Sequence, residues 1–179
     1  MNEIKSIVQE IETVMQSVDY EAFNKVVKMI HKDNTIFVSG EGRSGLVGKC
    51  FAIRMMHLGY NVHILGETLV PAMKKGDLLI ALSGSGNSDY VVVDIKKAKK
   101  NKNQVIAFTS KRDGFAAEHS DVNVIIPATI RSDKGDKRNS IQLLGSLFDQ
   151  SLHIVLDALT IKISQRDHIT NETATLKHW

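Results

Sequence analysis

The sequence predicts a single α/β domain built as a three-layer sandwich, in which helices cover both faces of a five-stranded parallel sheet. Short runs of β-branched and aromatic residues recur along the chain, and stretches with helical spacing separate them. The strand runs are largely apolar, which is typical of parallel strands buried on both faces and joined by right-handed crossovers. A chain of 179 residues can bury one such core without a disulfide or a structural metal.

Two amphipathic helices are expected before the sheet. Apolar side chains recur at helical spacing over residues 3–17 and again over 20–31, and Asp19 is placed to cap the second helix. The expected division of the one domain is therefore N-terminal helices over 1–32, an α/β core over 33–164 and a C-terminal tail with weak periodicity over 165–179.

Within the core, strands and helices alternate. We expect strands at 35–38, 61–65, 77–82, 104–109 and 122–126, and helices at 44–58 and 88–100. A polar, glycine-containing stretch, residues 127–140, predicts a long loop. The ends of parallel strands gather at one edge of the sheet, so the glycine-rich turns that follow the first and third strands are expected to meet there.

The final helix lies in the longest apolar segment, residues 141–163. Charged or titratable side chains are spread along it, namely Asp149, His153, Asp157 and Lys162. Each charge near the centre of a bilayer would cost about 3 kcal/mol, so the segment predicts a buried helix of a globular domain and no membrane span.

Composition and charge exclude several classes of protein. The net charge of +3 is too small to favour a nucleic-acid partner, and the basic run from Lys96 to Lys100 lacks interleaved aromatic residues, so it predicts a solvated helix face. The single cysteine, Cys50, lies among apolar helix residues and is expected to be a buried structural thiol. The N-terminal residues lack the apolar core of a signal peptide, which predicts a cytoplasmic protein.

The turn after the first strand reads GEGRSG, from Gly40 to Gly45, and fits the pattern G-x-G-x-x-G. That pattern between a strand and a helix is typical of dinucleotide sites, and Glu67 stands loosely where the acidic residue for the ribose is expected. A tight turn without a ligand has the same sequence, so the motif alone leaves both interpretations open.

The turn after the third strand reads SGSGNS, from Ser83 to Ser88, directly before a helix. Its hydroxyls and backbone amides, at the positive end of a helix dipole, favour a compact dianion. It lacks the Lys-Ser/Thr ending of a nucleoside-triphosphate loop, so a phosphate monoester fits better. The alternative is a flexible surface turn rich in small residues.

Three pieces of sequence, GRSGLVGKCFAIRMMHLGYNVHILGET, KKGDLLIALSGSGNS and SIQLLGSLFDQSLHIVLDA, resemble the sugar isomerase (SIS) domain family in this order and spacing. The chain is most similar to the 6-phospho-3-hexuloisomerases of that family. The resemblance implies a flavodoxin-like fold and conversion of a 3-hexulose 6-phosphate to fructose 6-phosphate, in the ribulose monophosphate route of formaldehyde fixation. It implies no redox cofactor, and the histidines show no spacing that suggests a metal site.

The resemblance also implies roles for individual residues. The expected substrate-binding residues are the phosphate-loop serines Ser83, Ser85 and Ser88, the loop residues Gly84, Gly86 and Asn87, and Arg43, Ser44 and Glu67 from the other strand ends. Asn87 stands where relatives often have glutamate. For Arg43 a structural salt bridge, and for Glu67 an exposed loop position, are the alternatives.

Asp149 matches the position of the glutamate base in the family motif LGSLFE, which here reads LGSLFD. We expect it to move the proton between adjacent carbons through an enediolate, and the alternative is a pair with His153 one helical turn later. His57, in RMMHLG, is expected to polarise the carbonyl or to assist ring opening, unless it is a core or interface histidine.

Sites of this family lie at subunit contacts, so the resemblance implies a homo-oligomer, a tetramer, in which His57 and Glu67 face a neighbour's substrate. Three other functions stay open: an isomerase of another phosphosugar, a SIS module that only senses a sugar phosphate, and a dinucleotide-dependent enzyme.

Overall fold

The structure, a computed structural model that describes residues 2–178, contains one five-stranded parallel sheet with the strand order β2-β1-β3-β4-β5. This confirms the predicted α/β class, and the order is that of flavodoxin-like folds. The strands are β1 (Thr35–Gly40), β2 (Asn61–Ile64), β3 (Leu78–Leu82), β4 (Gln104–Thr109) and β5 (Val122–Ile125).

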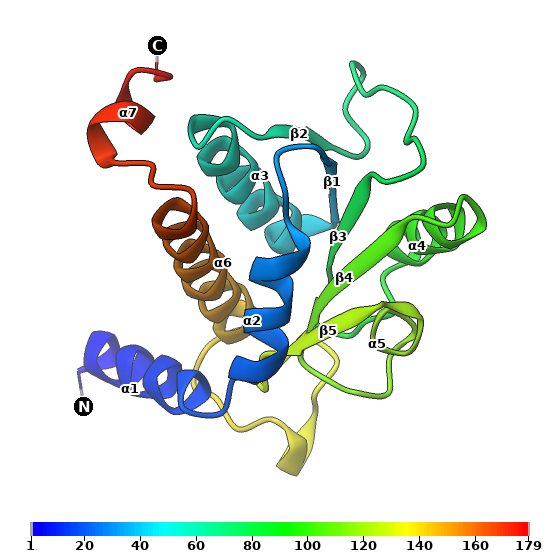
Figure 1. Ribbon diagram of the computed structural model, residues 1–179. Helices are drawn as coiled ribbons and strands as arrows, with labels where there is room; N and C mark the ends of the chain where they lie inside the picture. The colour runs from blue at the N-terminus through cyan, green and yellow to red at the C-terminus, as the bar shows by residue number, and fades with distance from the viewer. Residues whose placement is uncertain (1, 179) are drawn as a thin grey trace.

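Helices cover both faces of the sheet, as a three-layer sandwich requires (Figure 1). On one face lie α1 (Glu3–Met15), α2 (Tyr20–Met29), α3 (Gly42–His57) and α6 (Ser146–Arg166), and on the other lie α4 (Asp89–Lys100) and α5 (Phe115–His119). A short helix, α7 (Asn171–Thr175), follows α6, and a single 3₁₀ turn, η1 (Gly135–Lys137), lies in the loop after β5.

Alternate side chains of the strands separate two apolar cores. Ile80 of β3 belongs to the core beneath α3 and α6, whereas its neighbours Leu79 and Ala81 belong to the core beneath α4. All three are completely buried. Burial on both faces is why this strand has an unbroken apolar sequence. For the same reason, an apolar run without alternation is enough to predict a strand here.

The two shortest helices, α5 and α7, were not expected from the sequence. Each has five residues, too few for the apolar spacing that identifies a helix. The helix α7 begins with a capping box, in which Thr170 and Thr173 satisfy one another's backbone amides.

The last long helix begins later than the apolar segment does. Leu144 has a φ of 53° and Gly145 is the N-cap of α6, so residues 141–145 form a turn rather than helix. Leu143 and Leu144 are consequently 79% and 64% exposed. Among the described residues no helix is long and apolar enough to cross a membrane.

The prediction that Cys50 is buried was wrong. It is exposed on the outer side of α3, between Leu46 and Ile53, which are 61% and 54% exposed. The apolar neighbours that suggested burial belong to an uncovered face of the helix. The basic run at the end of α4 is solvent-exposed, apart from the buried Ala98, as expected.

Candidate functional site

The two glycine-rich turns lie side by side at the carboxyl edge of the sheet. β1 and β3 are hydrogen-bonded neighbours, with Gly40 opposite Leu82 at their ends. The strand order reverses here, because β2 lies beyond β1 while β4 and β5 lie beyond β3. Open α/β sheets bind ligands at such a point. The structure thus joins the turns at 40–45 and 83–88 in one place.

In the first turn, the glycines are needed for close packing. A Cβ added to Gly45 would lie 2.5 Å from the backbone oxygen of Gly40, and one added to Gly40 would lie 3.1 Å from the backbone nitrogen of Gly45. Gly42 begins α3 with a φ of +55°. Packing of the helix on the strand therefore accounts for the G-x-G-x-x-G spacing without a dinucleotide.

The second turn arranges its hydroxyl groups around one another. Ser83 is buried, and its Oγ accepts a hydrogen bond from the Gly86 amide at 3.1 Å and lies 2.8 Å from Ser88 Oγ. Ser85 Oγ accepts from the Asn87 amide at 3.2 Å. A hydroxyl that accepts a hydrogen bond keeps its own hydrogen to donate. Ser85 is therefore prepared to donate to an anion, and so is Ser88 when Ser83 is the donor of the bond between them.

The backbone of this turn packs tightly against the start of α6. A Cβ added to Gly84 would lie 2.8 Å from Ile130 Cγ2 and 3.1 Å from Phe148 Cδ1. Gly86 has a φ of +71°, which disfavours any side chain. The close packing at Gly84 places the serine-rich turn beside Phe148, the residue that precedes the predicted base Asp149.

Asn87 faces away from that cluster. Its Oδ1 accepts a hydrogen bond from the Phe115 amide at 3.0 Å, at the start of α5, and its Nδ2 donates to the Ser85 carbonyl at 3.2 Å. The side chain thus joins the turn to α5. In this position it supports the shape of the turn, and its predicted contact with a substrate stays a prediction.

Asp149 is 7% exposed, in the first turn of α6, and it is held by the turn after β1. The Ser44 hydroxyl donates to its Oδ1 at 2.6 Å, and Arg43 Nε lies 3.7 Å from its Oδ2. Burial raises the pKa of Asp149; the Ser44 hydrogen bond and the Arg43 charge lower it, but the net shift is upward. A carboxylate with a raised pKa is a better base near neutral pH.

The alternative partner of Asp149 is not used. His153 lies 3.7 Å from Asp157 instead, one turn further along α6. Arg43 forms a long ion pair with Asp149 and donates to Ser146 Oγ at 3.0 Å, and its predicted contact with a substrate stays a prediction. The three polar groups around Asp149 come from two segments about a hundred residues apart in the chain.

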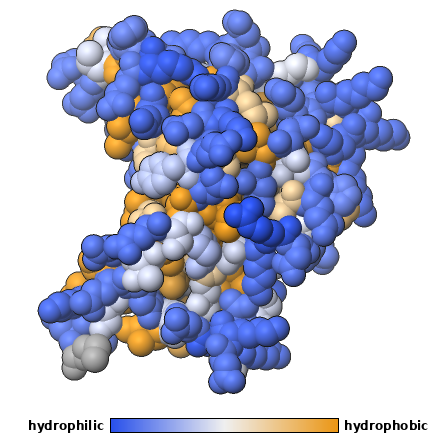
Figure 2. Space-filling view, turned by 60° about the horizontal axis from the view of Figure 1, so that its bottom comes forward, coloured by the Kyte–Doolittle hydropathy of each residue, from blue (hydrophilic) through white to orange (hydrophobic). Residues whose placement is uncertain are grey.

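These groups share one cavity of about 800 Å³, large enough for a sugar phosphate. The two turns and the segment from residue 130 to the start of α6 form its walls. The lining residues are Glu41, Gly42, Arg43, Ser44, Gly84, Ser85, Ser88, Ile130, Arg131, Ser132, Leu143, Leu144, Gly145, Ser146, Phe148 and Asp149. Figure 2, with the lower side of Figure 1 turned forward, shows apolar surface between polar margins on this side of the molecule.

His57 and Glu67 do not line this cavity. His57 ends α3, so at 1.5 Å per residue it lies about 20 Å along the helix axis from Ser44. It is buried beside His178, with ring centroids 5.2 Å apart. Burial, Arg54 and His178 together lower its pKa. Glu67 is half exposed and pairs with Lys49.

The sequence reasoning missed the wall formed by residues 130–132 and 143–146, and it missed Glu41. The long loop after β5 was predicted, and its position after a strand at the carboxyl edge was the available signal. Its contact with the serine-rich turn depends on how α6 packs, which no local pattern shows. Among the described residues no group of three or more His, Cys, Asp or Glu side chains is arranged to hold a metal ion.

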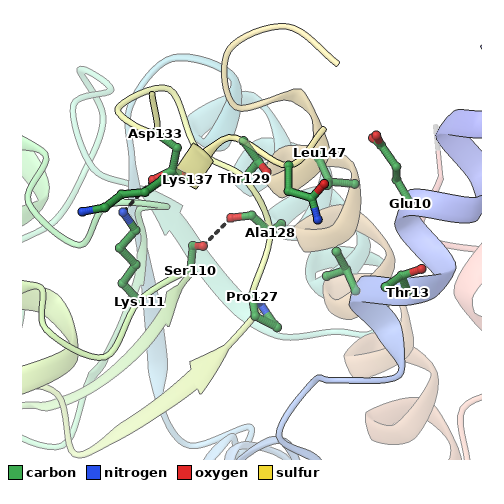
Figure 3. Close-up of a pocket in the computed structure, with 12 residues that line it drawn as sticks. Glu10, Thr13, Ser110, Lys111, Pro127, Ala128, Thr129, Asp133, Lys137 and Leu147 are labelled. Carbon is green, nitrogen blue, oxygen red and sulfur yellow. Dashed lines mark hydrogen bonds and ion pairs between the residues drawn. The ribbon is translucent and has the colours of Figure 1, made fainter. Parts of the chain in front are cut away.

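A second cavity of about 560 Å³ lies between α1 and the ends of β4 and β5 (Figure 3). Its acidic groups already have partners. Lys111 Nζ lies 2.7 Å from Asp133 Oδ1, and Glu10 accepts hydrogen bonds from Ser140 and from the Ile141 amide. The cavity that holds Asp149 combines a buried carboxylate with the serine-rich turn, so it is the candidate functional site.

Comparison with known proteins identifies the family of the chain. The SIS domain family matches residues 29–154. The chain is 32% identical to a 3-hexulose-6-phosphate isomerase of Bacillus subtilis (strain 168), over 98% of this chain and 95% of the relative. It is 36% identical to a 3-hexulose-6-phosphate isomerase of Mycobacterium gastri, over 99% and 88%.

A similar fold is also known from a crystal structure. A hypothetical protein of Methanococcus jannaschii, whose structure infers a molecular function of 3-hexulose-6-phosphate isomerase, matches with a TM-score of 0.85 and 29% identity. The match covers 100% of this chain and 98% of that one. With the family match, the sequence identities and the shared fold together, the chain belongs to the SIS domain family.

Proposed function

We infer that the protein is a sugar-phosphate isomerase, and we propose that it interconverts 3-hexulose 6-phosphate and fructose 6-phosphate in the ribulose monophosphate pathway. One observation carries the proposal: the buried carboxylate of Asp149 and the serine-rich turn line the same cavity. The similarity to isomerases of this substrate over nearly the whole chain supports the choice of sugar.

The phosphate group binds at the serine-rich turn. Ser85 and Ser88 donate hydroxyl hydrogens to it, and the positive end of the α4 dipole adds to the attraction. Arg43, on the opposite wall, supplies a full positive charge to the cavity. This end of the substrate takes no part in bond changes, so its role is to orient the sugar towards Asp149.

The carbonyl then moves by one carbon through an enediolate. Asp149 removes the proton from C2, the electrons of that C–H bond form the C2=C3 double bond, and the carbonyl at C3 becomes an oxyanion. Transfer of the hydroxyl proton from O2 to O3 leaves the carbonyl at C2, and Asp149 returns its proton to C3. The Ser44 hydroxyl holds the carboxylate in place, and Arg43 is near enough to stabilise the negative charge.

Asp149 is one methylene shorter than the glutamate of the family motif. α6 begins at Ser146, and Phe148 packs against Gly84, so Asp149 lies beside the serine-rich turn. The change is still the feature of the site that the experiment must address first.

The test is a coupled assay in which 3-hexulose 6-phosphate is generated in situ by its synthase and fructose 6-phosphate is followed through auxiliary enzymes to NADPH. We expect turnover by the native protein and a loss of about 10²-fold or more in Asp149→Ala, with folding checked by circular dichroism. Full activity of that variant would exclude Asp149 as the base.

A matched variant, Ser85→Ala, addresses binding rather than chemistry. We expect about a tenfold weaker affinity for fructose 6-phosphate, because a hydrogen bond to a charged group is lost. If the native protein binds the sugar phosphate but does not turn it over, the proposal shifts to the sensor function, or to another phosphosugar if one of a panel is converted.

We also propose that the protein acts as a homo-oligomer, a tetramer, in which His57 of one subunit serves a neighbour's cavity. Leu46, Cys50, Ile53 and His57 follow one another at intervals of four and three residues, so they share one face of α3. The first three are exposed, so residues 2–178 leave this apolar stripe uncovered. A second copy on this stripe would lie beside His57.

A further inference from the structure

Glu41 is a carboxylate of the cavity that the proposed reaction does not use. It lies in the turn after β1 and lines the cavity together with Ser85 and Ser88. Its Oε1 accepts a hydrogen bond from the backbone amide of Tyr90 at 2.7 Å. Tyr90 is the second residue of α4, so a side chain from the first turn caps the helix that follows the second turn.

Capping of α4 would ordinarily fall to Ser88. It is the N-cap residue, and an N-cap serine accepts a hydrogen bond from the amide of the second or third residue of its helix. Ser88 makes no such bond, and its Oγ lies 2.8 Å from Ser83 Oγ instead. The acceptor that the Tyr90 amide needs is supplied by Glu41, so the Ser88 hydroxyl is available to the loop.

The released hydroxyl matters for binding an anion. Two hydroxyl groups carry two hydrogens, and the bond between Ser83 and Ser88 uses one of them. Because Ser83 Oγ also accepts from the Gly86 amide, the pair is fixed in place with one hydrogen left to donate. Ser88 lines the cavity whereas Ser83 is buried. The remaining hydrogen is therefore the one that Ser88 donates to a ligand.

We propose that Glu41 is a positioning residue for the phosphate-binding turn: by capping α4 in place of Ser88, it holds the Ser88 hydroxyl in the rotamer that meets Ser83 and faces the substrate's phosphate. The identity of the anion rests on the proposed function, whereas the positioning of Ser88 through Glu41 and Tyr90 is independent of which anion binds.

A carboxylate beside a phosphate dianion has a second effect, electrostatic repulsion, and the two effects have opposite signs. If positioning dominates, removal of the Glu41 side chain weakens binding. If repulsion dominates, removal of the charge strengthens it. Glu41→Gln separates them, because the amide oxygen of glutamine still accepts from the Tyr90 amide but the charge is gone.

The experiment is calorimetric titration of the full chain with fructose 6-phosphate. We expect Glu41→Ala to bind about fivefold more weakly, in line with the loss of a helix cap, and Glu41→Gln to recover most of that loss. Asp89→Asn is the matched control, because it removes a negative charge from the first turn of the same helix. Equal or tighter binding by Glu41→Ala would overturn the proposal.

Two further measurements test the route of the effect. In a double-mutant cycle, Glu41→Ala should add little to Ser88→Ala, and full additivity would contradict action through Ser88. In a crystal structure of unliganded Glu41→Ala, the Ser88 hydroxyl should turn from Ser83 to the Tyr90 amide. An unchanged Ser88 rotamer would overturn the positioning role of Glu41, whether or not the native protein binds a sugar phosphate. Failure of the native protein to bind a sugar phosphate would refute only the proposed function.

Discussion

At the scale of the residue, Asp149 combines two features that oppose one another. Its carboxylate is nearly buried, which costs free energy when it is ionised, yet only the ionised form is a base. The Ser44 hydrogen bond and the Arg43 charge offset part of that free-energy cost. The net upward shift in the pKa of Asp149 indicates that they do not offset all of it. Ionised Asp149 thus lowers the stability of the folded protein at neutral pH, a cost that its proposed role as the base requires.

We therefore expect Asp149→Asn to be more stable than the native protein near pH 7. The folded-state pKa is raised above the ordinary value of 3.8, so the folded protein binds more protons than the unfolded chain as pH rises from that value, and native stability falls. Asparagine has no such titration. The melting temperature of Asp149→Asn should exceed that of the native protein by about 2 to 4 °C for each kcal/mol of burial cost that the substitution removes.

Thermal unfolding at about pH 7 and at about pH 3.5 provides the measurement and its control. In acid most Asp149 side chains are protonated in both the folded and the unfolded state, so the difference should shrink. A native protein that is more stable than Asp149→Asn near pH 7 would show that the ion pair with Arg43 outweighs the cost of burial.

At the scale of the element, the segment from β5 to α6 is the wall of the cavity, and side chains from elsewhere hold it. Glu10 of α1 accepts hydrogen bonds from the Ile141 amide and from Ser140 and Gln142. Burial raises the pKa of Glu10, but these hydrogen bonds outweigh it and the net shift is downward. The contacts therefore persist until the pH falls below the usual range for glutamate.

We expect Glu10→Ala to raise the KM for the sugar phosphate about fivefold, with a smaller effect on kcat. Loss of about 1 kcal/mol of hydrogen bonding loosens residues 140–142, which lead into the wall but do not contact the reacting carbons. Steady-state kinetics measures the effect. Glu12→Ala, an exposed residue of the same helix, should behave like the native protein, and an unchanged KM for Glu10→Ala would separate α1 from the site.

At the scale of the whole molecule, the exposed stripe on α3 is an apolar surface near His57 that residues 2–178 leave uncovered. We expect Ile53→Glu to reduce the molar mass measured by light scattering after gel filtration, because a charge at the centre of an apolar contact must be desolvated. Val93→Glu, at a similarly exposed position on α4, is the control and should leave the mass unchanged. An unchanged mass in Ile53→Glu would place the subunit contact on another surface.

Several elements of this fold can be predicted from the sequence, because they depend on interactions between residues that are close together in the chain. The unbroken apolar run of β3 predicts a strand buried on both faces, and the turn from Ser83 to Ser88 predicts an anion site, since both depend on neighbouring residues. The motif around Asp149 predicts the base only through the family resemblance, and that role stays a proposal. Helices α5 and α7 were missed because five residues carry too little periodicity.

Only the tertiary structure decided which of these residues meet. Ser44 and Asp149 are 105 positions apart in the sequence, and they lie within 2.6 Å because α3 and α6 pack side by side on one face of the sheet. The same packing leaves Cys50 exposed and puts His57 at the far end of α3. Sequence patterns record which faces of an element are apolar, whereas the packing of distant elements determines which apolar faces are covered and which polar groups share a cavity.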